Sequence, residues 1–199
     1  MLYSLCKTLF FIVFRLFFRL RVEGVENIPA QGAVLLASNH LSLLDPPLIG
    51  SVSPRRVRFM AKEELFAYPV FGTIIKELGA FPVRRGSGDR QAIKTGLTIL
   101  DEGGAMAMFP EGTRSKTGEL GKAMPGALML AAKSGAAIVP IALSGTDKLG
   151  RDNWFPRFAI RFGAPYQLPE VFSRQELDEQ GAVLMEKIRD LQLAQQQGD

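Results

Sequence analysis

The chain has 199 residues, of which 47% are hydrophobic and 22% charged; this composition favours one folded domain and argues against global disorder. A single cysteine, Cys6, and a single histidine, His40, exclude an intramolecular disulfide framework, a cysteine-based zinc site and a histidine-rich metal cluster. The net charge of +4 suits three kinds of partner: nucleic acid, an anionic membrane or a phosphorylated substrate.

The first 20 residues are predominantly apolar, but three cations, Lys7, Arg15 and Arg19, interrupt them. On a helical wheel the cations share one face, while leucine, isoleucine and phenylalanine fill most of the rest. The longest uncharged run, 8–14, is much shorter than the roughly 20 apolar residues that a spanning helix needs. We therefore expect residues 1–20 to form an interfacial helix whose cations face lipid headgroups.

Two other interpretations of this segment stay open. A signal peptide would need a small-residue cleavage site, and none is found. A helix packed into the protein core is the second alternative, although three cations on one face suit a membrane surface better.

Apolar runs and amphipathic stretches alternate along the rest of the chain. We expect strands at 21–25, 33–37, 57–61, 80–83, 105–109, 137–143 and 158–162, and helices at 46–52, 70–78, 89–102, 125–133 and 174–197. Pro82 favours an edge position or an irregular end for its strand. This alternation predicts an α/β fold with a mostly parallel central sheet flanked by helices. No repeat or long linker divides the chain, so residues 21–199 should form a single domain.

His40 and Asp45 follow the apolar run 33–37, which is a predicted buried strand. Asp45 is a candidate N-cap, and Pro46 suits the first position of the helix that follows. The two side chains could meet across one tight turn. A carboxylate on one ring nitrogen fixes the tautomer and leaves the other nitrogen free as a base. The alternative is an ordinary turn in which a local aspartate satisfies a lone histidine, because this spacing alone is a weak signal.

Polar side chains follow four of the predicted strands. They are His40 and Asp45 after the first, Lys62 after the second, Arg84 and Arg85 after the third, and Glu111, Thr113 and Arg114 after the fourth. Strand-end loops of an α/β sheet can converge on one crevice. Such a crevice suits an anionic substrate with a hydroxyl to be activated, although solvated surface charges remain an alternative for the Arg84–Arg85 pair.

No Gly-x-Ser-x-Gly nucleophile elbow occurs in the sequence, so a covalent acyl-serine route has no obvious carrier. The direct route has His40 remove a proton from a substrate hydroxyl, which then attacks an activated acyl carbon. There is no P-loop, and basic residues are not interleaved with aromatic ones as on a nucleic-acid platform. We therefore expect no nucleic-acid partner.

Five motifs together resemble those of the glycerolipid acyltransferase family. They are N-H-x4-D at 39–45, A-K-x-E-L at 61–65, G-x-x-x-[VI]-x-R at 79–85, F-P-E-G-T-R-S at 109–115 and V-P-[IV] at 139–141. Their order and spacing cover most of the predicted domain. The resemblance implies the fold of glycerol-3-phosphate acyltransferases, with His40 as general base and Asp45 as the group that orients it.

The resemblance also implies the other site residues. Substrate binding, chiefly of the acceptor and its phosphate, would involve Lys62, Arg84, Arg85, Glu111, Gly112, Thr113 and Arg114. Val139 and Pro140 would line the acyl pocket. The donor would be acyl-CoA or acyl-acyl carrier protein, with no metal and no further cofactor.

The implied reaction acylates the sn-2 hydroxyl of 1-acyl-sn-glycerol 3-phosphate (lysophosphatidic acid) and gives phosphatidic acid. A lyso-ornithine lipid or another lysophospholipid is an alternative acceptor. A remote alternative function is that of a non-catalytic peripheral membrane adaptor. Because acyl thioesters are made in the cytoplasm, we expect peripheral or monotopic attachment to the cytoplasmic side of the cell membrane.

Overall fold

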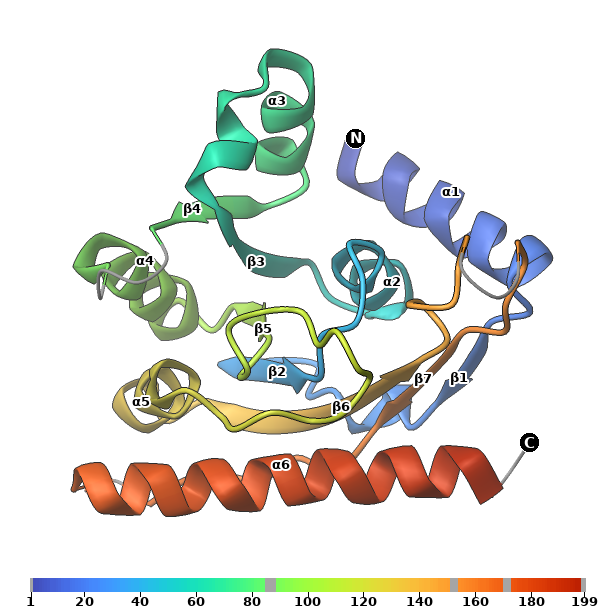
Figure 1. Ribbon diagram of the computed structural model, residues 1–199. Helices are drawn as coiled ribbons and strands as arrows, with labels where there is room; N and C mark the ends of the chain where they lie inside the picture. Colours follow the sequence, from blue (N-terminus) through green and yellow to red (C-terminus); the bar gives the residue numbers. More distant parts are fainter. Residues whose placement is uncertain (1, 85–88, 151–153, 170–172, 198–199) are drawn as a thin grey trace.

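The computed structural model describes residues 2–84, 89–150, 154–169 and 173–197 (Figure 1). Its centre is a sheet of seven strands in the order β1-β7-β6-β2-β5-β3-β4. The strands are β1 Arg21–Glu23, β2 Val34–Ser38, β3 Val57–Lys62, β4 Ala80–Val83, β5 Ala105–Met108, β6 Ala137–Ser144 and β7 Ala159–Phe162. Neighbouring strands are parallel except for β6 and β7. The predicted α/β class with a mostly parallel sheet is confirmed.

Helices cover both faces of this sheet. They are α1 Leu2–Phe17, α2 Asp45–Val52, α3 Pro69–Glu77, α4 Arg90–Asp101, α5 Pro125–Ser134 and α6 Arg174–Gln197, with short 3-10 helices η1 Val25–Asn27 and η2 Glu63–Ala67. In Figure 1 the long helix α6 lies along one side of the sheet, and α1, α2 and α3 lie on the other.

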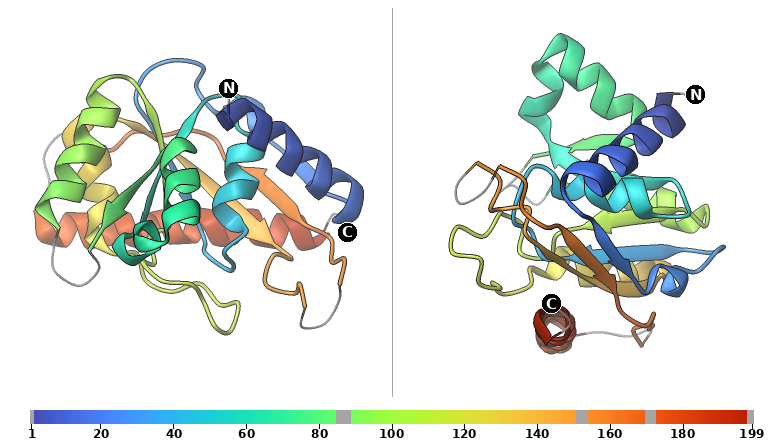
Figure 2. Two further views of the ribbon diagram at one scale, coloured as in Figure 1. Left: turned by 90° about the horizontal axis from the view of Figure 1, so that it is seen from above. Right: turned by 90° about the vertical axis from the view of Figure 1, so that its right-hand side faces the viewer.

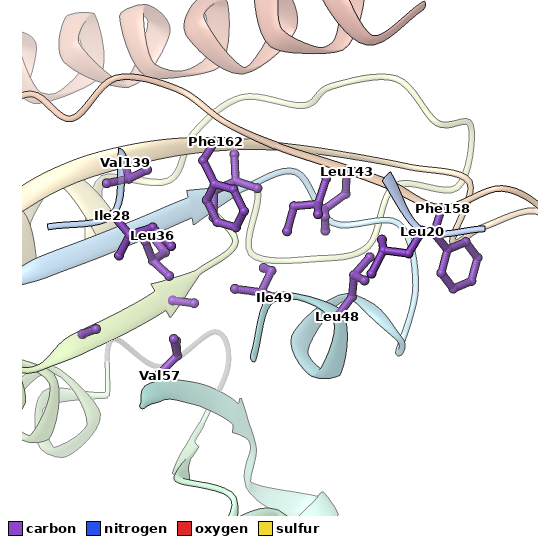
Figure 3. Close-up of a cluster of buried hydrophobic side chains, with 14 of the residues drawn as sticks. Leu20, Ile28, Leu36, Leu48, Ile49, Val57, Val139, Leu143, Phe158 and Phe162 are labelled. Atoms are coloured by element: carbon purple, nitrogen blue, oxygen red, sulfur yellow. The ribbon is translucent and has the colours of Figure 1, made fainter. Parts of the chain in front are cut away.

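Alternation along β2 divides the core into two layers. Val34 and Leu36 point toward α1 and α2, where Figure 3 shows Leu36 among the buried side chains of this layer. Leu35 and Ala37 point the other way and pack with buried side chains of α4, α5 and α6. Successive side chains of a strand face opposite sides of a sheet, so a strand covered by helices on both faces is apolar throughout.

Local chemistry explains several element boundaries. Helix α4 begins where the Asp89 carboxylate accepts hydrogen bonds from the backbone N–H groups of Gln91 and Ala92, at 3.0 and 3.1 Å. Strand β4 is an outer strand, which confirms the edge position predicted from Pro82. Helix α5 ends before Gly135, whose φ of +62° is the left-handed conformation that glycine adopts without strain.

Helix α1 packs onto the domain through one apolar face. The ring of Phe14 is buried and lies 5.7 Å from the rings of both Phe10 and Phe158. Phe18, just beyond the helix, stacks on Phe158 at 4.3 Å. These rings belong to the same core layer as α2.

The cations of the N-terminal segment hydrogen-bond to the protein itself. Each donates to a main-chain carbonyl: Lys7 to Ser53 at 2.6 Å, Arg15 to Leu20 at 2.7 Å and Arg19 to Phe155 at 3.2 Å. Arg15 and Arg19 are nevertheless exposed. That the three cations face lipid headgroups therefore stays a prediction.

The outward face of α1 also carries a row of apolar side chains. Four exposed side chains recur at helical spacing along it, namely Leu5, Leu9, Ile12 and Leu16. None of the helices in the described part of the chain combines the length and apolar character needed to cross a bilayer.

Candidate active site

The polar residues predicted to act together follow four parallel strands. Strands β2, β5, β3 and β4 lie side by side in that order, so their carboxyl ends meet at one edge of the sheet. The segment after β5 is therefore the immediate neighbour of His40. Strand β4, which leads to Arg84, is three strand positions from β2, or about 14 Å at the usual spacing of neighbouring strands.

His40 and Asp45 form the centre of this edge. The Nδ1 atom of His40 lies 2.8 Å from Oδ2 of Asp45, and both side chains are buried. Because an ionised carboxylate only accepts hydrogen bonds, this contact assigns a proton to Nδ1. The Nε2 atom then carries the lone pair that a general base needs.

Four donors converge on the Asp45 carboxylate. Its Oδ2 atom also accepts the backbone N–H groups of Leu41 and Ser42 at 2.6 and 2.7 Å, and its Oδ1 atom accepts the hydroxyl of Thr146 at 2.6 Å. Burying a charged group is costly unless hydrogen-bond donors of the protein replace the water molecules that would solvate it. The four donors replace this water around the Asp45 carboxylate. Thr146, which follows β6, is a functional residue that the sequence reasoning missed.

The N-cap predicted at Asp45 is wrong. Leu44 occupies the cap position of α2, and Asp45 is the first residue of the helix. Its carboxylate points back into the His40 turn and accepts two backbone N–H groups there. Because the Asp45 carboxylate accepts hydrogen bonds from that turn and from His40, it does not cap α2.

Neighbouring side chains fix the position of His40. Its ring stacks on Phe109 with centroids 3.8 Å apart and planes inclined by 14°. The side chain of Asn39 exchanges two hydrogen bonds with the backbone of Leu143 in β6: it donates to the carbonyl at 3.0 Å and accepts from the N–H at 2.7 Å. The turn is thus held from β5 on one side and from β6 on the other.

Glu111 joins the His40 turn to the loop that follows β5. One carboxylate oxygen accepts the backbone N–H of His40 at 3.1 Å, and the other accepts that of Gly121 at 2.9 Å. The backbone N–H of Ser115 donates to the carbonyl of His40 at 2.8 Å. Arg114, the residue before Ser115, therefore lies in a segment whose backbone is bonded to that of His40.

A shallow polar hollow opens in this loop. Its lining includes Glu111, Thr113, Ser115, Leu120, Gly121 and Lys122. Gly112 turns the chain here with φ +72°, and a Cβ on it would lie 2.5 Å from the sulfur of Met124. Thr113 and Arg114 are exposed, and Arg114 forms no ion pair with any residue in the described ranges.

Two of the predicted phosphate ligands contact glutamates instead. The Nζ atom of Lys62 lies 3.1 Å from Oε1 of Glu64, and Nε of Arg84 lies 2.8 Å from Oε2 of Glu63. The hydrogen bond that Arg84 donates to Glu63 raises the pKa of Arg84. Arg85 lies outside the described residues. Arg114 is the predicted cation whose backbone lies beside His40.

The residues predicted for the acyl pocket lie in β6. Val139 is fully buried and pairs in register with Leu36, and Pro140 pairs with Ala37. Both belong to the interior of the sheet, four and three residues before Leu143, which contacts Asn39.

Among the described residues, no three or more histidine, cysteine, aspartate or glutamate side chains are grouped as a metal site. The chemistry that the site offers is that of an oriented imidazole base. It lies next to an exposed arginine and a polar loop.

Comparison with known proteins shows which family has this sequence and fold. The family model described as "Acyltransferase" matches residues 19–144, which include the His40 turn, the loop after β5 and all of β6. The chain is a member of the acyltransferase family. The match ends two residues before Thr146.

Several curated proteins are similar to this acyltransferase. A chloroplastic 1-acyl-sn-glycerol-3-phosphate acyltransferase of Arabidopsis thaliana is 37% identical over 67% of the chain and 38% of its own length. The enzyme of that name from Bacillus subtilis is 32% identical over 72% of each chain. A lyso-ornithine lipid O-acyltransferase of Pseudomonas aeruginosa is 37% identical over 64% of the chain and 48% of its own length. The chain thus spans about two fifths of the Arabidopsis relative.

A solved structure is similar to the acyltransferase over nearly its whole length. The 1-acyl-sn-glycerophosphate acyltransferase of Thermotoga maritima superposes with a TM-score of 0.78 and 28% identity, covering 96% of this chain and 79% of the other. The fold that the sequence motifs implied is therefore confirmed.

Proposed function

We propose that this acyltransferase moves a fatty acyl group from an acyl thioester to the sn-2 hydroxyl of 1-acyl-sn-glycerol 3-phosphate, giving phosphatidic acid. The observation that carries the proposal is the buried His40–Asp45 pair held against the Phe109–Ser115 segment. The names of the Arabidopsis and Bacillus relatives support this acceptor.

The reaction begins when Nε2 of His40 takes the proton of the acceptor hydroxyl. The hydroxyl oxygen attacks the thioester carbonyl, and the C–S bond breaks as the new ester C–O bond forms. Asp45 stabilises the imidazolium that results, because its carboxylate accepts the Nδ1 proton. The leaving thiol has an ordinary pKa of about 8.5, so its thiolate departs without a separate acid.

We expect no metal and no cofactor beyond the donor thioester. His40 takes the proton of the acceptor hydroxyl, and the donor's sulfur leaves as a thiolate, so the reaction as proposed needs no further group. Acyl-CoA and acyl-acyl carrier protein are both candidate donors. Val139 and Pro140 are proposed to line the acyl pocket through the side of β6.

The acceptor phosphate is proposed to bind at the loop after β5. Arg114 is exposed there, and a guanidinium matches a phosphate with two parallel hydrogen bonds. Gly112, Thr113 and Glu111 would shape this part of the site. Lys62 and Arg84 would join after exchanging their glutamate partners for phosphate, and Arg85 is proposed as a further phosphate ligand.

Peripheral attachment to the cytoplasmic face of the membrane is proposed to occur through α1. The support is the exposed apolar stripe of this helix, which suits the boundary between headgroups and acyl chains. Lysophosphatidic acid resides at that boundary.

A lyso-ornithine lipid is the second candidate acceptor, since the Pseudomonas relative named for it is as similar as the Arabidopsis one. Purified protein would be given one labelled acyl donor and lysophosphatidic acid, lyso-ornithine lipid or lysophosphatidylglycerol in matched mixed micelles. We expect the highest kcat/KM for lysophosphatidic acid and a large loss of turnover with His40→Ala. A higher kcat/KM for lyso-ornithine lipid would replace the proposed acceptor.

A further inference from the structure

The apolar face of helix α3 is exposed at the surface of the protein. Tyr68, at the N-cap position, is 62% exposed, and three apolar side chains of the helix, Val70, Phe71 and Ile74, are 74%, 49% and 38% exposed. An amphipathic helix of a globular protein normally turns such residues to the core. Here the apolar face has no core behind it.

A glycine forms the close contact between α3 and its support. A Cβ added to Gly72 would lie 2.5 Å from the carbonyl oxygen of Phe66 in η2. The helix therefore approaches η2 on the side that carries Gly72. The sequence sets this orientation, since the larger apolar residues occupy other positions of the helix.

Helices α3 and α1 lie on the same side of the molecule. Figure 1 and the right-hand view of Figure 2 place both helices across the sheet from α6. Arg56 connects them: its guanidinium donates to the carbonyl of Glu77, the last residue of α3, at 2.8 Å and lies 5.1 Å from the ring centroid of Tyr3 in α1. The carboxyl end of α3 is therefore linked to the first turn of the helix proposed to attach to the membrane, and both helices face the same side of the molecule.

The chemistry of this surface favours a lipid bilayer as its occupant. Tyrosine and phenylalanine are suited to the boundary between headgroups and acyl chains. The acidic residues of η2 are neutralised, Glu63 by Arg84 and Glu64 by Lys62, so they repel anionic headgroups little. Lys76 and Glu77 of α3 are both exposed, so the helix itself carries no net charge that would repel anionic headgroups.

We propose that α3 is a second membrane contact, through which Tyr68, Val70, Phe71 and Ile74 enter the same leaflet as α1. This inference rests on the attachment proposed for α1. The first turn of α3 follows η2, which begins at the carboxyl end of β3. Docking of both helices therefore brings the edge of the sheet that carries His40 toward the lipid surface.

Vesicle co-sedimentation tests the proposal with the full chain. The vesicles contain phosphatidylethanolamine and phosphatidylglycerol, and no acyl donor is present. The double variant Val70→Ser/Phe71→Ser removes two exposed apolar side chains of α3, and Val183→Ser/Leu193→Ser removes two exposed ones of α6 as a matched control. We expect the apparent Kd for vesicles to rise about tenfold or more in the α3 variant and to stay unchanged in the control.

A fluorescent label gives a second readout that does not depend on the stability of the serine variants. In a Cys6→Ser background, an environment-sensitive dye is attached to Phe71→Cys or, as control, to Leu193→Cys. We expect a blue shift and quenching by lipid-borne quenchers at position 71 alone. A dye at position 71 that stays in water on vesicle-bound protein would overturn the proposal.

Two further measurements separate the remaining outcomes. If sedimentation velocity shows a lipid-free dimer that the Val70→Ser/Phe71→Ser variant dissociates, while vesicle binding is unchanged, α3 is a self-association surface and the proposal fails. If Leu9→Ser/Leu16→Ser in α1 weakens vesicle binding and the α3 variant does not, attachment through α1 stands and the α3 contact falls. Turnover of short-chain monomeric lysophosphatidic acid tests the proposed reaction independently of both.

Discussion

The hydroxyl of Thr146 donates a 2.6 Å hydrogen bond to Oδ1 of Asp45, across 101 positions of sequence. Both residues are buried. The contact holds the carboxylate so that its other oxygen, Oδ2, meets Nδ1 of His40. Thr146 is a positioning residue, since it acts on the base only through Asp45.

Replacement of this hydroxyl should lower kcat. Thr146→Val keeps the shape of the side chain and removes the donor, so we expect kcat to fall about tenfold with little change in the acceptor KM, given the roughly 1.5–3 kcal/mol attributed to hydrogen bonds with charged groups. Steady-state kinetics measure both constants. Thr146→Ser restores the donor and should recover most of the rate. Equal losses in the valine and serine variants would assign Thr146 a packing role only.

Loss of the base should abolish most turnover. We expect His40→Ala to reduce kcat about 10²- to 10⁴-fold, the range typical of general base catalysis. Release of free thiol from the donor measures the rate, and circular dichroism together with vesicle binding checks that fold and attachment persist. Near-normal transfer by a folded His40→Ala protein would contradict the mechanism.

The predicted phosphate ligands should differ in importance. Arg114 lies in the loop bonded to His40, whereas Arg84 follows the outer strand β4 and pairs with Glu63. We expect Arg114→Ala to lower kcat/KM about 10- to 100-fold, mainly through the acceptor KM, and Arg84→Ala to have a smaller effect. The comparison is made at constant donor concentration. A larger loss for Arg84→Ala would move the phosphate toward β4.

The N-cap of α4 should contribute stability that depends on pH. Backbone N–H groups of Arg84, Ala92 and Gln91 hold the pKa of Asp89 below its ordinary value of 3.8. A carboxyl whose pKa is lowered by folding stabilises the protein above its unfolded pKa, and this contribution disappears as pH falls through the folded value. We expect Asp89→Ala to lower Tm at pH 7 and to change it progressively less below pH 4.

Thermal unfolding followed by circular dichroism measures this difference. Asp89→Asn is the matched control, because asparagine caps a helix without a charge. If the effect of Asp89→Ala on Tm is the same at pH 7 and at pH 3, the ionised carboxylate does not stabilise the cap.

Local patterns were sufficient to predict most elements of the fold. Apolar runs bounded by turn residues located the strands, and Pro46 located the start of α2, which brings Asp45 back toward His40. The strand order is a different matter, since β5 inserts between β2 and β3 although it follows both in sequence. That insertion, which no local pattern encodes, places Glu111 beside His40.

Long-range contacts limited the prediction of the site. A lone threonine after a strand carries no spacing signal, and Thr146 reaches Asp45 only because β6 lies beside β2. The contacts that the cations of α1 make within the protein could not be predicted for a related reason. A helical wheel separates cations from apolar residues, but it does not reveal that the carbonyl of Ser53 is available to bind Lys7.

The Asn39 side chain continues the pairing of β2 with β6 after the backbone of β2 has turned away. These bonds fix the position of the His40 turn relative to Leu143, which lies in the same strand as Val139 and Pro140. With the acyl pocket proposed at Val139 and Pro140, acyl-chain preference and turnover rate would depend on the same strand. An insertion or deletion in β6 made to reshape the acyl pocket would displace the base as well, whereas a size change at a single side chain would leave its position intact.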